Sequence, residues 1–218
     1  MATSKRRTSG VQRRGRASDA AMQRRVNQRG GAMPIDWRLL IVGGVLVLGV
    51  IVLVIVLVFG GSSGPRVGTP MPDEGATHVD QSTFPTYQSR PATSGPHWNL
   101  GDGVAPVFWG VYTSPVAEPA VVHNLEHGGI VIWYQDTATA DDIQKLTQFT
   151  EQAQSGSNFK VVLSPWAGED FGHPIAVTAW DWLLYLDTAD IDQIRAFQDD
   201  HPTTDAPEPA GGPAQGAR

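Results

Sequence analysis

The feature that most constrains this chain is an uninterrupted apolar run from Leu39 to Phe59, which contains no charged residue and no proline. As a helix it would extend about 31 Å, which matches the hydrocarbon core of a bilayer. It is longer than the roughly 7–15 apolar residues of a cleaved secretory signal, and no A-x-A cleavage site follows it. The sequence therefore predicts one retained transmembrane helix over residues 39–59.

Charge is distributed very unequally on the two sides of this run. Residues 1–38 hold ten of the sixteen basic residues and only two acids, whereas the remainder holds six bases and twenty acids. Basic segments stay on the cytoplasmic side of a membrane. We therefore expect a plasma-membrane protein with residues 1–38 in the cytoplasm and the rest outside. Binding of nucleic acid or of anionic lipid is an alternative role for this segment. Because no aromatic residue precedes Trp37, we interpret 1–38 as a disordered orientation segment and expect no nucleic-acid partner.

Composition divides the outer part into three. Residues 60–76 are rich in glycine, proline and serine, which predicts a flexible linker. Residues 202–218 have the same character and are expected to form a disordered tail. One extracytoplasmic domain over 77–201 remains. The chain has no cysteine, which excludes disulfides, thiolate metal sites and cysteine nucleophiles.

The domain sequence predicts an α+β fold. Residues 77–120 are proline-rich and irregular, and strands are expected at 121–125, 130–134, 159–163 and 175–186, where apolar and β-branched residues concentrate. Thr139 and Asp142 form a capping-box pattern that begins a helix ending near Gly156, and a last helix follows Asp187 or Thr188. A strand–helix–strand step implies a parallel pair. We therefore expect a small mixed sheet with helices packed on one face, preceded by the transmembrane helix.

Two polar motifs stand out in this domain: Val122-His123-Asn124-Leu125-Glu126-His127-Gly128-Gly129 and Ser94-Gly95-Pro96-His97-Trp98. Neutral imidazole is a common ligand of zinc and copper. On a helix, His123 and His127 would lie on one face with Cβ atoms about 5–6 Å apart, but on a strand about 13 Å would separate them. The β-branched flanks favour a strand. A shared metal therefore requires a helical or bent backbone at 123–127, or a partnership with His97 or His78.

These motifs resemble a family of membrane-anchored proteins, the domain of unknown function 3105. The resemblance covers about residues 77–208. It rests on His78-Val79, Thr93-Ser94-Gly95-Pro96-His97, Trp109-Gly110-Val111-Tyr112, the H-N-L-E-H-G string and Thr178-Ala179-Trp180. Ala92 stands where the family usually has a second proline, and Asp181 where glycine is common. The resemblance implies an anchored extracytoplasmic domain and supplies no reaction.

Three functional hypotheses follow. In the first, the domain is a metal-binding module for a copper or zinc ion, and its candidate ligands are His97, His123 and His127, with Glu126 or His78 as a further ligand. Met71 is the only methionine after residue 59, which argues against a methionine-rich copper(I) site. In the second, the module docks on another envelope or membrane protein and the histidines and glutamate form a structural network.

The third hypothesis is an enzyme that uses Glu126 and a histidine as acid and base. The pattern H-x-x-E-H also formally matches the inverted zinc-peptidase motif. That motif needs a long helix, which Gly128-Gly129 would interrupt. The residues alone leave open whether the protein is an enzyme.

Overall fold

The computed structural model describes residues 44, 47–48, 50–51 and 65–217. Within these residues, no helix has both the length and the apolar character needed to cross a bilayer. The predicted transmembrane helix over 39–59 lies outside the described residues at all but five positions, and the basic segment 1–38 lies outside them entirely. Gly64–Arg218 forms one compact unit, which carries both polar motifs.

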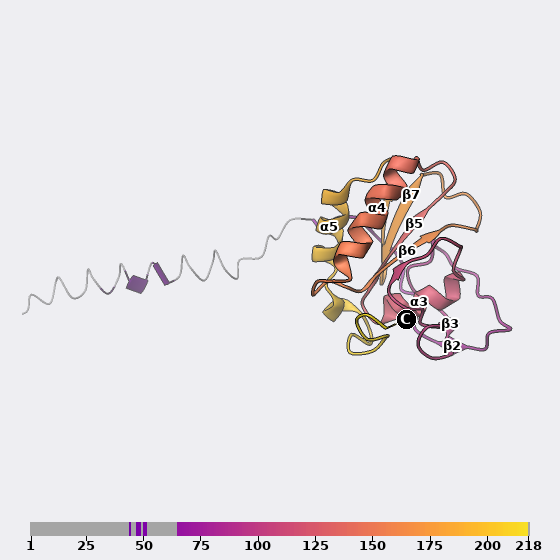
Figure 1. The fold of residues 1–218 in the computed structure, drawn as a ribbon. Coiled ribbons are helices and arrows are strands. Elements are labelled where there is room, and N and C mark those ends of the chain that lie inside the picture. Colours follow the sequence, from indigo (N-terminus) through magenta and orange to yellow (C-terminus); the bar gives the residue numbers. More distant parts are fainter. Residues whose placement is uncertain (1–43, 45–46, 49, 52–64, 218) are drawn as a thin grey trace, which may run out of the picture. The chain divides into compact units, whose positions relative to one another are not determined.

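A six-stranded mixed sheet forms the centre of this unit (Figure 1). Its strands are β1 (Thr69–Pro70), β4 (Gly110–Val111), β5 (Ile130–Tyr134), β6 (Val161–Pro165), β7 (Ile175–Ala179) and β8 (Trp182–Leu186), in the spatial order β1-β8-β7-β5-β6-β4. Strand β6 pairs in parallel with β5 and with β4, and the other pairs are antiparallel. The predicted parallel pair, β5 and β6, is therefore confirmed. A separate parallel pair consists of β2 (His78–Val79) and β3 (His97–Trp98).

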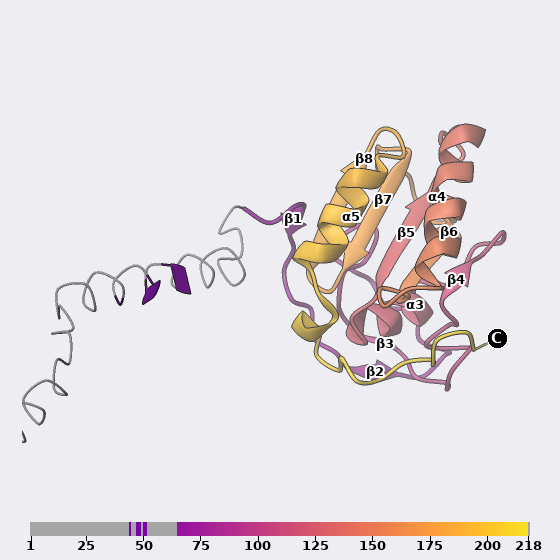
Figure 2. The ribbon, with the colours of Figure 1, turned by 60° about the vertical axis from the view of Figure 1, so that its left-hand side comes forward.

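Three helices, α3 (Glu118–Glu126), α4 (Ala140–Ala153) and α5 (Ile191–Asp200), pack against the sheet. On one face, Ile132 and Val177 belong to a core with Leu146 of α4 and Phe197 of α5. The prediction that all helices pack on one face is wrong, because α3 covers the opposite face, as Figure 2 shows. There the neighbouring strand residues Val131, Trp133 and Val162 pack with Val121 and Leu125 of α3. Strands that are apolar at every position need cover on both faces.

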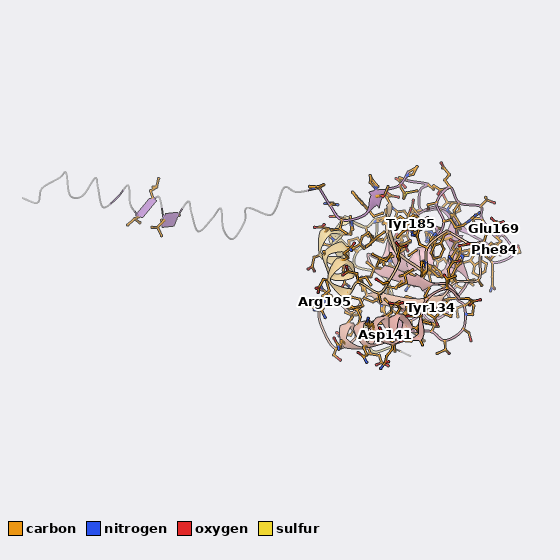
Figure 3. All side chains as sticks on the ribbon, turned by 90° about the horizontal axis from the view of Figure 1, so that it is seen from above. Phe84, Tyr134, Asp141, Glu169, Tyr185 and Arg195 are labelled. Carbon is orange, nitrogen blue, oxygen red and sulfur yellow. The ribbon has the colours of Figure 1, made fainter. Side chains whose placement is uncertain are left out.

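Helix α4 begins as the sequence predicts. The Thr139 hydroxyl accepts the Asp142 backbone N–H at 3.1 Å, and the Asp142 carboxylate accepts the Thr139 N–H at 3.3 Å, which completes the capping box. The guanidinium of Arg195 on α5, labelled in Figure 3, lies over the ring of Phe149 on α4, 6.0 Å from its centre. The long strand predicted over 175–186 is instead the hairpin β7–β8. Its turn places Asp181 at φ 60°, a conformation that glycine adopts most easily.

The largest error of the sequence prediction is at residues 121–125, which are helical rather than extended. Pro119 lies in the first turn of α3, where its missing N–H costs no hydrogen bond. At the other end Gly128, at φ +74°, donates to the Leu125 carbonyl at 2.9 Å, and Gly129 donates to the Asn124 carbonyl at 3.1 Å. These two bonds form a Schellman motif. The β-branched residues of α3 face the core, and their packing outweighs their preference for strands.

The segments expected to be flexible on either side of the domain are in part docked on it. Within the predicted linker, β1 pairs with β8, and the Val67 N–H donates to the Asp200 carboxylate at 2.7 Å. Pro70 is tolerated because β1 is an edge strand. Within the predicted tail, a short 3₁₀ helix, η1 (Thr203–Asp205), leads into a segment that runs past α3 towards β4 (Figure 2). Composition did not predict this docking because it depends on partners distant in sequence.

Specific contacts hold this C-terminal segment, residues 203–217. The Trp109 indole N–H donates to the Pro213 carbonyl at 2.8 Å, and the Gln215 amide donates to the carbonyls of Gln154 and Gly156. Lys160 donates to the His127, Pro209 and Gly211 carbonyls at 2.7, 2.9 and 3.2 Å. The segment therefore closes over the C-terminal end of α3.

The close fit at the end of α3 predicts the effect of an added methyl group. At Gly128 a Cβ would lie 2.5 Å from the Thr203 carbonyl oxygen, whereas at Gly172, also at positive φ, it would meet nothing within 4 Å. Gly172→Ala should lower the free energy of unfolding by about 1–2 kcal/mol through backbone strain alone. Gly128→Ala should lower it by about 1–3 kcal/mol more, because Thr203 must move. Urea denaturation measures both, and equal losses would contradict the docking of the C-terminal segment.

His201 at the end of α5 predicts a pH dependence. Its buried ring lies against Trp182 and Phe197, and its Nε2–H donates to the Val67 carbonyl at 2.9 Å. Burial lowers its pKa below the ordinary 6.5, and Arg66 acts in the same direction, while the Val67 bond and the carboxylates of Asp200 and Asp205 oppose them. The unfolded chain therefore takes up this proton at higher pH than the folded protein does.

The stabilisation that neutral His201 gives is thus complete above about pH 6.5 and is lost as the pH falls below that value. His201→Gln keeps a donor for Val67 but does not titrate. The difference in unfolding free energy between wild type and His201→Gln should therefore shrink as the pH falls from about 7.5 to 5. Chemical denaturation at a series of pH values measures it. A difference that stays constant would show that His201 has the same pKa in both states.

Candidate metal centre

The small parallel pair β2–β3 brings two histidines together. His78 and His97 are direct register partners, so their side chains leave the same face of neighbouring strands. The His97 backbone N–H donates to the Thr77 carbonyl at 2.9 Å, which fixes this register. His97 is completely buried, whereas the His78 side chain is 39% exposed. The pair therefore has one solvent-facing and one interior imidazole.

The Ser94-Gly95-Pro96 motif positions His97. Gly95 adopts φ +117°, and a Cβ there would lie 3.1 Å from the Tyr87 ring. The Tyr87 hydroxyl donates to the Pro96 carbonyl at 2.7 Å, and the Ser94 hydroxyl accepts the Glu74 backbone N–H at 3.0 Å. The conformation before His97 is therefore fixed on both sides of the chain.

Helix α3 supplies the other half of the site. His123 and Glu126, three residues apart, lie on the face turned towards β3. Between them, the Asn124 side chain accepts the Val107 N–H at 3.0 Å and donates to the Val107 carbonyl at 2.8 Å, and Leu125 enters the core. The first and last residues of H-N-L-E thus face the site, and the two between them hold the helix in place.

Three imidazoles converge on one carboxylate oxygen. The Nε2 atoms of His97, His78 and His123 lie 3.1, 3.4 and 3.6 Å from Glu126 Oε2. The three rings are close to one another, with centroids 4.8, 4.9 and 5.1 Å apart. One ligand atom from each of the four residues lies within 4.8 Å of every other. This spacing suits a single ion at their centre.

The other ring nitrogens define the protonation of two of these histidines. His97 Nδ1 lies 2.9 Å from the Gly95 carbonyl oxygen, and His123 Nδ1 lies 2.7 Å from that of Trp98. A carbonyl oxygen only accepts, so Nδ1 carries the proton in both rings. In the neutral rings, Nε2 is then a lone pair directed at a carboxylate oxygen. The two Nε2 atoms and the Glu126 oxygen that they face are all acceptors, so this arrangement requires either a proton or a cation between them.

Burial disfavours an additional proton on either His97 or His123. Desolvation lowers the pKa of His97 and lowers the pKa of His123 to about 4, in each case as the largest cause. The carbonyl bonds and Glu126 oppose this shift without overcoming it. Both rings are therefore neutral near pH 7, which is the form that binds metal ions.

His78 occupies the solvent edge of the cluster. The Asn99 side-chain nitrogen lies 3.2 Å from His78 Nδ1, and in that orientation the amide donates to Nδ1 and His78 Nε2–H donates to Glu126. Turning the Asn99 amide by 180° would make its oxygen the acceptor of Nδ1–H. His78 Nε2 then becomes a third lone pair at the centre. Asn99 therefore acts as a second-layer partner of the kind that orients metal-binding histidines.

The electrostatic setting favours a cation. His123 and Glu126 belong to the last turn of α3, where the helix dipole is negative. Three imidazoles and one carboxylate form a donor set that zinc accepts in four-coordinate sites and that copper(II) also accepts. No sulfur ligand lies in this group of four. The residues present therefore fit a divalent transition-metal ion.

Four of the five predicted ligands come together around one centre, and the ring of His127 lies beside that of His123 but belongs to a neighbouring group with Glu126. The sequence paired His123 with His127, but the helical pair that meets at the centre is His123 with Glu126. His127 is the C-cap of α3, and its Nδ1–H donates to the Glu208 carbonyl at 3.0 Å. Two further residues at the site, Asn99 and Glu208, do not stand out in the sequence. Asn99 follows the P-H-W motif directly, but Glu208 lies in a segment that composition alone marks as disordered.

These features define an α+β domain with a buried histidine–carboxylate cluster. The chain matches the family model DUF3105, described as a protein of unknown function, over residues 78–215, and it belongs to this family. The matched range contains both histidine motifs and nearly all of the docked C-terminal segment. No curated protein and no solved structure matches the chain.

Proposed function

We propose that the domain binds one zinc or copper ion through His78, His97, His123 and Glu126, on the outer face of the plasma membrane. The observation that carries the proposal is the orientation of His97 and His123. Each donates Nδ1–H to a carbonyl and directs its Nε2 lone pair at Glu126. A divalent ion at the centre converts this repulsion into four favourable bonds.

The burial of the cluster supports a tightly held ion. Glu126 is 2% exposed, and a carboxylate removed from water needs a compensating positive charge. In the described part of the chain, only histidines lie within ion-pair distance of this carboxylate, and no lysine or arginine does. The half-exposed ring of His78 provides the side from which an ion enters.

The location rests on the sequence. The apolar run at 39–59 has the length of a membrane span, and the basic residues before it favour a cytoplasmic N-terminus. In this arrangement the metal-binding domain lies outside the cell, where a chain without cysteine is insensitive to the oxidising environment. A partner in the envelope would then meet the ion on the His78 side.

Metal binding by the full chain in detergent tests the proposal. After treatment with a chelator, the wild type should take up one tightly bound zinc or copper ion, measured by elemental analysis. His78→Ala should weaken binding by more than roughly tenfold, because loss of an outer-layer partner alone typically costs 10–100-fold. His173→Ala is the matched control, since its side chain is 40% exposed, compared with 39% for His78, and it bonds only to Asp187.

The thermal stability of the same proteins gives a second measurement. An ion at 100 times its dissociation constant should stabilise the wild type by about 2.7 kcal/mol, and His97→Gln should abolish this gain. A wild type that binds no ion, together with a loss of stability in His97→Gln, would contradict the proposal. That result would favour the alternative, an interaction module in which the cluster is a structural network.

A further inference from the structure

We propose that a second cation binds beside the first, held by His127 and Glu208 and bridged to the first ion by the Glu126 carboxylate. This inference rests on the proposed function, because Glu126 is shared by both positions. One nitrogen of His127 and one carboxylate oxygen from each of Glu126 and Glu208 lie within 4.8 Å of one another. The ring of His127 lies next to that of His123, with centroids 4.7 Å apart.

The ring of His127 has the same hydrogen-bond arrangement as the rings of His97 and His123. Its Nδ1–H donates to the Glu208 carbonyl at 3.0 Å, so the neutral ring leaves Nε2 as a lone pair. Among the described residues 65–217, that Nε2 atom has no hydrogen-bond partner, and it is not one of the buried unpaired atoms, so it reaches solvent although the residue as a whole is only 5% exposed. An imidazole with one nitrogen held by a carbonyl and one accessible free nitrogen, beside two carboxylates, can accept a cation from solution.

The charges nearby are not neutralised by the protein. Glu126 and Glu208 lie at the negative end of α3. Lys160, the nearby cation, donates to the carbonyls of His127, Pro209 and Gly211, and it makes no ion pair with either carboxylate within the described part of the chain. Within the described residues, the Glu208 carboxylate therefore has no cationic partner from the protein, and it adds a negative charge beside Glu126.

The backbone of the C-terminal segment positions Glu208 beside Glu126 and His127. The Glu208 backbone N–H donates to the Glu126 carbonyl at 3.0 Å, which places the two glutamates side by side. Gly211 lies so close to His127 that a Cβ would come within 2.3 Å of its ring, and at Gly212 the distance would be 3.1 Å. The backbone thus packs directly on the imidazole and fixes both the ring and the residue that completes the group.

The two positions differ in chemistry. The first has four protein ligands, as in closed zinc sites, whereas the second has one nitrogen and two carboxylate oxygens. Three protein ligands leave a coordination position open for water or for an oxygen of a bound molecule. Glu208 is also exposed. The second ion should therefore bind more weakly and exchange faster than the first.

Zinc titration of the full chain in detergent tests this inference, with calorimetry to resolve the binding events and elemental analysis to count the ions. The wild type should bind one zinc ion tightly and a second more weakly. Glu208→Gln removes a charge from an exposed side chain without threatening the fold, and it should weaken the second event at least tenfold while the first is unchanged. Glu151→Gln, an exposed glutamate on α4, is the matched control and should retain both events.

The outcomes separate this inference from the proposed function. A single zinc ion, lost in His97→Gln but unaffected by Glu208→Gln, would overturn the second site and leave the first in place. A wild type that binds no zinc or copper would overturn both. His127→Gln should reproduce the effect of Glu208→Gln, and retention of two ions in both variants would show that the second ion lies elsewhere.

Discussion

The buried carboxylate of Glu126 is the point on which the rest of this domain depends. Its side chain meets imidazoles from β2, β3 and α3, and its backbone carbonyl receives the N–H of Glu208 from the C-terminal segment. Four parts of the chain, distant in sequence, are therefore joined at one residue. A buried charge of this kind persists only when its surroundings compensate it, and in the observed orientation only the His78 N–H does so directly, which leaves room for the cation that we propose.

The string H-N-L-E-H-G-G can now be understood residue by residue. Two of its members face the centre, Asn124 replaces a missing strand partner for Val107, and Leu125 fills the core. His127 and the two glycines end the helix, and a side chain at either glycine would collide with Thr203 or Trp109. Every position of this string is therefore accounted for by a contact in the structure.

The sequence predicted correctly those features that depend on residues close together in the chain or on the order of successive elements. The capping box at Thr139 follows from a pattern within a few residues, and the parallel pair formed by β5 and β6 follows from the order strand, helix, strand; the structure confirms both. The prediction of a strand at 121–125 was wrong because β-branched composition outweighed two better signals, Pro119 at the start and Gly128 after the end. The continuous apolar runs in β5 and β7 also indicated a sheet covered on both faces.

Other features depend on chain segments that are far apart, and no local pattern could supply them. The convergence of His78 and His97 needs a two-residue parallel pairing, too short to be recognised by periodicity. The C-terminal segment has the composition of a disordered tail, yet a few specific contacts, such as that of Trp109 with Pro213, are enough to dock it. The candidate residues were identifiable from the sequence because histidines are few, but their partners were not.

The register of β2 and β3 has a further consequence for a chain that has no cysteine. A slip of one residue would turn His78 away from His97 and bring Val79 to the centre in its place. An ion held between these strands and α3 would act as a removable cross-link, closing two long loops and restricting the unfolded chain as a disulfide does. Such a cross-link responds to the supply of metal rather than to the redox state, so the folding of this domain would depend on whether the metal is available.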